Sequence, residues 1–182
     1  MSHTMLADRA DGTLGSHVLT DGSSLFARIE SVATFSGCAF EVGSGFIPLL
    51  IFGAAKKSWM PARRYDFGPD TPTIDVAGWC QGAVAEIGRG RLAFYGEAAM
   101  FTAQLFGPDH FPVGMNCPVA RDNARFLLNI VHWLSRVEGM PPAQTYEPRA
   151  ESDRPDGERQ TWWRAAHVGL CFDWRVPKSS RP

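Results

Sequence analysis

Cys80 and Glu97, in the middle of the chain, have the residue types and the setting that catalysis or ligand binding requires. Cys80 is the central residue of Gly78-Trp79-Cys80-Gln81-Gly82, which matches the G-x-C-x-G pattern of a nucleophile elbow. An elbow needs an apolar strand before it and a helix after it, so that a strained turn exposes the nucleophile. Residues 70–77 contain proline and aspartate, and the residues after the motif predict a strand. The pattern therefore favours a structural cysteine, and a cysteine nucleophile is the alternative.

A thiol nucleophile also needs a histidine base within hydrogen-bond reach and a lowered pKa. His110 and His132 are the histidines that follow Cys80 within the predicted domain, and no histidine of the chain stands two residues before a glutamate. The spacing of histidines and carboxylates does not match a zinc site either. We therefore expect no metal and no cofactor, and we assign no catalytic residue with confidence.

Glu97 follows a short predicted strand and precedes a run of helix-forming residues, 98–104. A carboxylate in this position can accept hydrogen bonds from the first amides of a helix. It can also hold a ligand, with Gln104 reaching the same edge. Both interpretations stay open, and Glu97 and Gln104 are candidate ligand-binding residues.

The element expected to position Glu97 is a β-hairpin. Gly88 and Gly90 flank Arg89, which is a tight-turn signal because glycine adopts positive φ without steric cost. Residues 83–87 and 92–95 on either side are apolar runs of strand length. Further strands are predicted at 32–35 and 47–52.

The strongest predicted helix covers residues 120–137. Its apolar positions form a wide face typical of a helix that packs on a sheet. Arg125, Asn129, His132 and Arg136 step by four, three and four residues, so we expect them to form one polar stripe. A second, short helix is predicted at 23–30.

The remaining segments show little periodicity. Residues 1–16 predict an irregular lead-in, and residues 53–78 and 107–118 contain several prolines and predict long connections. Residues 141–182 are rich in proline and charge, which is typical of a disordered or loosely docked tail.

Three segments resemble class I glutamine-amidotransferase-like domains, in particular their trehalose-utilisation-like branch: Gly88 to Glu97, Asp122 to Leu134, and His17 to Gly22. The resemblance implies a flavodoxin-like three-layer α/β sandwich over residues 17–140. Only 16 residues precede His17, so it covers the C-terminal two-thirds of such a domain and implies an incomplete sheet. It also implies that Asn116 and Asn123 approach the Glu97 edge, which makes them further candidate ligand-binding residues.

Composition limits the function classes. The chain has 182 residues, 45% of them hydrophobic, and 18 basic against 19 acidic residues. This balance argues against a nucleic-acid-binding surface, which needs clustered positive charge. Apolar runs are shorter than the roughly 20 residues that a membrane helix requires. The four cysteines lack the spacing of a disulfide framework or a metal knuckle, so we expect a cytoplasmic protein with reduced thiols.

The sequence leads to one main function hypothesis and two alternatives. The first is a non-catalytic, amidotransferase-like binding or assembly module with an unknown small-molecule or protein partner. A homo-oligomer that completes the sheet is compatible with it. The alternatives are a small hydrolase or amidase that depends on Cys80 or a metal, and a truncated gene product without independent function.

Overall fold

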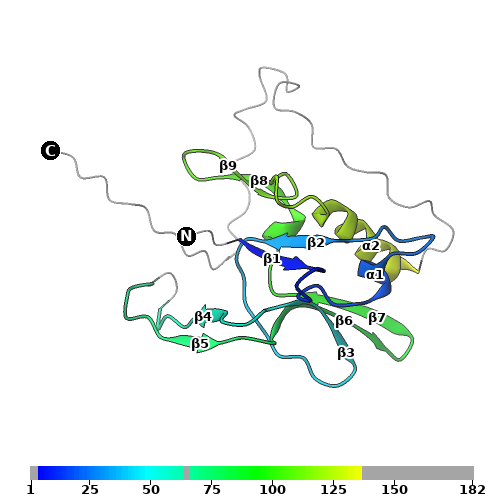
Figure 1. Cartoon of the computed structure of the whole chain (residues 1–182), viewed down its shortest axis with the longest axis horizontal. Helices are drawn as coiled ribbons and strands as arrows, with labels where there is room; N and C mark the ends of the chain where they lie inside the picture. The colour runs from blue at the N-terminus through cyan, green and yellow to red at the C-terminus, as the bar shows by residue number, and fades with distance from the viewer. Residues whose placement is uncertain (1–3, 64–65, 137–182) are drawn as a thin grey trace, which may run out of the picture.

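The structure, a computed structural model, describes residues 4–63 and 66–136 (Figure 1). Its strands form small antiparallel sheets. One sheet pairs β1 (Met5–Asp8) with β2 (Ser31–Thr34), and a three-stranded sheet has the order β3 (Phe46–Ile51), β6 (Cys80–Ile87) and β7 (Gly90–Tyr95). Two hairpins pair β4 (Lys57–Trp59) with β5 (Thr73–Asp75), and β8 (Ala103–Phe106) with β9 (Phe111–Gly114).

The predicted flavodoxin-like three-layer α/β sandwich is wrong. Such a sandwich is built on a parallel sheet whose strands are joined by crossover helices. Among the described residues every strand pair is antiparallel. The helices of this part are the one-turn α1 (Val18–Asp21), the 3₁₀ turn η1 (Ala99–Phe101) and α2 (Asn123–Ser135).

The helix predicted over residues 120–137 corresponds to α2. This helix contributes buried side chains to the main hydrophobic core. Its buried positions Phe126, Ile130 and Trp133 pack with residues of β1, β2, β3 and β6. The predicted polar stripe is only partly correct, because Asn129 is 1% exposed whereas Val131 on the opposite side is 47% exposed. The helix therefore turns one of its asparagines into the protein and some of its apolar residues outward.

Asn129 explains why the predicted helix over 23–30 does not form. Its Oδ1 accepts a hydrogen bond from the Ala27 N–H at 3.1 Å, and its Nδ2 donates to the Ala27 carbonyl at 2.7 Å. Nδ2 also donates to the Leu19 carbonyl at 2.9 Å. The backbone groups that a helix would pair internally are therefore bound by a side chain from α2, and residues 22–30 form an irregular segment pinned to that helix.

The hairpin prediction is confirmed. β6 and β7 pair with Gly82 opposite Tyr95 and Glu86 opposite Arg91, and Gly88 in the turn has a φ of +57°. The strand predictions at 32–35 and 47–52 correspond to β2 and β3. The helix expected over 98–104 is limited to the turn η1, because Thr102 is extended and β8 begins at the next residue, Ala103.

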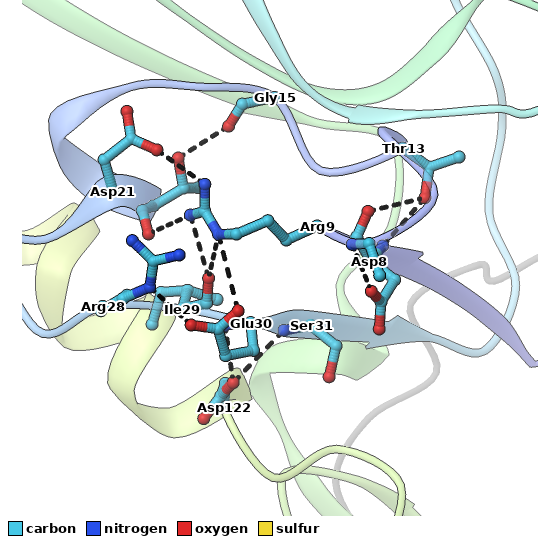
Figure 2. A network of polar contacts seen from close by, with 12 residues as sticks. Asp8, Arg9, Thr13, Gly15, Asp21, Arg28, Ile29, Glu30, Ser31 and Asp122 are labelled. Atoms are coloured by element: carbon cyan, nitrogen blue, oxygen red, sulfur yellow. Dashed lines mark hydrogen bonds and ion pairs between the residues drawn. The ribbon is translucent and has the colours of Figure 1, made fainter.

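Residues 1–16, expected to be irregular, contain β1 and the arginine that organises this end of the molecule (Figure 2). Arg9 Nη1 pairs with the Asp21 carboxylate at 2.9 Å, and Nη2 donates to the carbonyls of Thr20 at 2.6 Å and Ile29 at 3.1 Å. The Arg9 side chain thus joins β1, α1 and the residues that lead into β2. This contact fixes α1 beside the segment that leads into β2.

Two of the predicted connections carry hairpins. Residues 53–78 contain β4 and β5, and residues 107–118 contain β9. The tail expected at 141–182 lies outside the described residues. Within residues 4–63 and 66–136, no helix has the length and apolarity needed to cross a membrane.

Candidate functional site

The G-x-C-x-G segment around Cys80 leads into β6, the central strand of the three-stranded sheet. Cys80 is the first residue of β6, is 1% exposed, and pairs with Phe40 and Ile51. Its Sγ lies 3.5 Å from the Phe40 carbonyl oxygen. Burial raises the pKa of the Cys80 thiol to about 11. A protonated, buried thiol is a poor nucleophile, so this geometry supports the structural interpretation of Cys80.

Glu97 caps η1. Its Oε2 accepts a hydrogen bond from the Met100 N–H at 2.9 Å, and the residue is 4% exposed. Burial raises the pKa of Glu97 to about 7, and the nearby backbone amides of Met100, Ala99 and Phe35 act in the opposite direction. The carboxyl group is therefore largely protonated in mildly acidic solution.

Buried oxygen atoms without a hydrogen-bond partner among the described residues gather around Glu97. They are Glu97 Oε1, Gln81 Oε1 and Ser36 Oγ. A Cβ built on Gly37 would lie 2.7 Å from Glu97 Cβ and 2.8 Å from Gln81 Nε2, which shows that both side chains lie directly beneath Gly37. This cluster is packed against the backbone and belongs to the interior.

The other predicted ligand-binding residues form hydrogen bonds within the protein. Gln104 Nε2 donates to Thr102 Oγ1, and Asn116 Nδ2 donates to the Gln104 carbonyl at 3.2 Å. Asn123 is fully buried, with Oδ1 accepting from the Ala33 N–H at 2.9 Å and Nδ2 donating to the carbonyls of Ala33 and Met100. Gln104 and Asn116 therefore contact each other, and Asn123 binds Met100, whose N–H also binds Glu97.

A pocket of about 390 Å³ lies between α1, α2 and the β6–β7 hairpin, and we call it the α1–α2 pocket. These three elements lie side by side in Figure 1. The polar lining comes from His17, Glu86, Arg91, His132 and Arg136, and the apolar lining from Val18, Leu25, Phe26 and Trp133. An apolar pocket with a few converging polar groups is the usual form of a small-molecule site.

His17 is held in place at the start of α1. Its Nδ1 accepts a hydrogen bond from the Leu19 N–H at 3.4 Å, and its ring meets the Trp133 ring edge-on with centroids 5.4 Å apart. Because Nδ1 is the acceptor, Nε2 carries the proton of the neutral ring. Burial lowers the pKa of His17, with the charge of Asp21 opposing that effect. His17 is therefore neutral at pH 7 and presents a fixed ring to the pocket.

Arg91 is the most constrained charge of the pocket. Its Nε pairs with Glu86 Oε1 at 2.9 Å, and its Nη1 donates to the Trp133 carbonyl at 2.7 Å. The guanidinium carbon lies 5.0 Å from the centroid of the Trp133 ring, within cation–π range. Glu86 and Arg91 face each other across the hairpin, so the strand register itself forms this pair.

A second hollow is an open groove of about 250 Å³ on the other side of the three-stranded sheet. It is lined by apolar residues and glycine: Phe40, Val42, Gly43, Phe46, Leu92 and Phe94. It has no titratable side chain in its lining, so it offers no chemistry beyond apolar contact.

The described residues contain no group of three or more histidine, cysteine, aspartate or glutamate side chains that could hold a metal ion. Comparisons with protein-family models, with curated proteins and with solved structures find no match to this chain. The resemblance to amidotransferase-like domains therefore depends on its sequence segments alone.

Proposed function

We propose that the protein is a non-catalytic binding module that holds a small molecule in the α1–α2 pocket. The observation that carries the proposal is the lining of this pocket, in which four apolar side chains face five polar ones. Its volume of about 390 Å³ falls within the range of small-molecule sites, roughly 300–1,000 Å³. In this proposal the binding residues are those of the α1–α2 pocket, such as His17 and Arg91, in place of the residues at the Glu97 edge.

The arrangement of reactive groups supports binding over catalysis. Cys80 is not among the residues that line the pocket, and its thiol is buried with a raised pKa. Glu86, the carboxylate of the pocket, is paired with Arg91. A nucleophile beside a general base, which acyl transfer requires, is not found in the pocket lining.

The neutral fluorescent probe N-phenyl-1-naphthylamine tests the site. We expect it to bind the wild-type protein, and we expect Val18→Trp to weaken that binding at least about tenfold, since the indole fills the pocket. Leu25→Trp fills it from another segment and serves as a second variant if the first unfolds. Val42→Trp in the open groove is the matched control and should leave binding unchanged. Equal binding to wild type, Val18→Trp and Leu25→Trp would refute the site.

We also propose a cytoplasmic location and a homo-oligomer. The first is supported by free thiols at Cys38, Cys80 and Cys117 in the described part. The second is supported by β7, an outer strand of its sheet, on which Leu92 and Phe94 are 40% and 50% exposed. Sedimentation equilibrium of the wild type and of Leu92→Glu tests it, because a monomeric wild type would exclude this assembly.

A further inference from the structure

The charges around the α1–α2 pocket do not cancel. Arg91 and Arg136 each bring a guanidinium group, and Glu86 brings the one carboxylate of the lining. Glu86 is bound to Arg91 at 2.9 Å, so this pair is locally neutral. Arg136 Nη2 donates to the Arg89 carbonyl at 2.9 Å, and no ion pair of Arg136 occurs among the described residues. Among the described residues, the guanidinium charge of Arg136 is therefore left without an ion pair.

The C-terminal end of α2 also borders the pocket and carries partial negative charge. Two carbonyl groups at this end already accept hydrogen bonds. The Trp133 carbonyl accepts from Arg91 Nη1, and the His132 carbonyl accepts from the Arg136 N–H. A hydrogen bond to a carbonyl leaves the guanidinium of Arg136 charged and leaves its other N–H groups free for a second acceptor. The guanidinium group of Arg136 can therefore pair with an anion at the rim of the pocket.

The apolar part of the lining, which we call the apolar wall, comes from four side chains. Val18, Leu25 and Phe26 come from α1 and the segment after it, and Trp133 comes from α2. Trp133 is 4% exposed, and the His17 ring and the Arg91 guanidinium hold its orientation. A ligand that lies on this wall has an apolar body, and its charged group then reaches the rim.

Combining the charged rim and the apolar wall, we infer that the ligand of the α1–α2 pocket is a small organic acid, with its anionic group on Arg136 and its apolar body on Val18, Leu25 and Phe26. This inference rests on the proposed function. A guanidinium pairs with a carboxylate or a phosphate through two parallel hydrogen bonds, which fixes the orientation of such a ligand. Arg136 is the specificity-determining residue, and Arg91 is a positioning residue that holds Trp133.

Two probes with the same ring system separate the anion from the apolar body. 1-Anilinonaphthalene-8-sulfonate carries a sulfonate group, and N-phenyl-1-naphthylamine is its neutral counterpart. Arg136→Gln removes the charge from an exposed position. We expect this variant to bind the anionic probe about tenfold more weakly, as for one lost charge-assisted hydrogen bond, and to bind the neutral probe as the wild type does. Arg121→Gln, an exposed arginine ahead of α2, is the control for net charge.

The outcomes separate this inference from the proposed function. If Arg136→Gln weakens both probes equally or neither, while Val18→Trp still abolishes binding, the pocket binds small molecules without preferring acids and the inference is wrong. If Val18→Trp and Leu25→Trp leave both probes bound, the site itself is wrong. Competition by 1-naphthoate and by 1-naphthyl phosphate then distinguishes a carboxylate from a phosphate ligand. Displacement by neutral 1-naphthylmethanol as effectively as by either acid would also overturn the inference.

Discussion

The guanidinium of Arg91 stands 5.0 Å from the centre of the Trp133 ring and donates a hydrogen bond to the carbonyl of the same residue. One arginine thereby joins the β6–β7 hairpin to the last turn of α2. Because Glu86 holds the other side of this guanidinium, the wall of the α1–α2 pocket is fixed before any ligand arrives. A preformed wall lowers the ordering cost of binding.

Arg9 should be among the most important polar residues for stability. Arg9→Ala removes the ion pair with Asp21 and the hydrogen bonds to Thr20 and Ile29, several of them charge-assisted. We expect the free energy of unfolding in urea to fall by about 3 kcal/mol. Arg28→Ala is the control, since Arg28 is exposed and pairs with Glu30 at the surface, and it should change stability by less than about 0.5 kcal/mol. Equal effects of the two variants would contradict the network in Figure 2.

Gly37 should not tolerate a side chain. Its φ is +100°, and an added Cβ would lie 2.3 Å from the Gly96 carbonyl oxygen. Gly37→Ala therefore combines backbone strain with a backbone clash, and we expect a loss of about 3 kcal/mol in urea unfolding. Gly43→Ala adds a Cβ in open space and should stay within about 0.5 kcal/mol of the wild type. A wild-type urea midpoint for Gly37→Ala would show that the segment does not lie against Gly96 and Glu97.

Glu97 should make stability depend on pH. Its pKa rises from 4.5 to about 7 on folding because of burial. Its contribution is fully present below pH 4.5 and is lost as the pH rises through 7, which lowers the free energy of unfolding by up to about 3 kcal/mol. Glu97→Gln keeps an acceptor for the Met100 N–H and cannot ionise, so its unfolding free energy should change less between pH 5 and pH 8.

The control for this pH effect is Glu41→Gln, at an exposed position, which should retain the full pH dependence of the wild type. The measurement is urea unfolding of the three proteins at pH 5, 6, 7 and 8. If Glu97→Gln and the wild type lose stability in parallel over this range, Glu97 is not the group that titrates.

Cysteine labelling tests the alternative of a Cys80 nucleophile. At pH 8 the raised pKa lowers the thiolate fraction of Cys80 about a hundredfold relative to a thiol with the ordinary pKa of 9.0, and the side chain is buried. Cys38 is exposed, so iodoacetamide should modify it first. The experiment uses native protein with Cys171→Ser, followed by peptide mapping by mass spectrometry. Rapid labelling of Cys80 with a midpoint below pH 8 would restore the hydrolase hypothesis.

The secondary-structure elements that depend on a local turn or on the periodicity of apolar residues were predictable from the sequence. The Gly88–Gly90 turn with its flanking apolar runs gave β6 and β7, and the wide apolar face gave α2. The sheet arrangement was not predictable in this way, because side chains distant in sequence determine it. Asn129 binds the backbone of Ala27, 102 residues away, and Arg9 binds that of Ile29. Periodicity carries no information about such contacts.

In the candidate site, too, local features were predictable from the sequence and contacts between distant segments were not. Capping by Glu97 was foreseen, since it depends on a neighbouring turn. The α1–α2 pocket was missed, because His17, Arg91 and Trp133 come from three separate segments. One signal was present in the sequence. A tight turn at Gly88–Gly90 sets the hairpin register, and that register places Glu86 opposite Arg91, an ion pair close to the turn.

The central claim is that this protein binds a small acid in the α1–α2 pocket. The most direct test follows the indole N–H signal of Trp133 by two-dimensional nuclear magnetic resonance while 1-naphthoate is added to the full chain. We predict a saturable shift of the Trp133 indole and of the Arg136 amide, with the amides of Phe40 and Phe94 in the open groove unchanged. Shifts confined to Phe40 and Phe94, or no saturable shift at Trp133, would contradict the account.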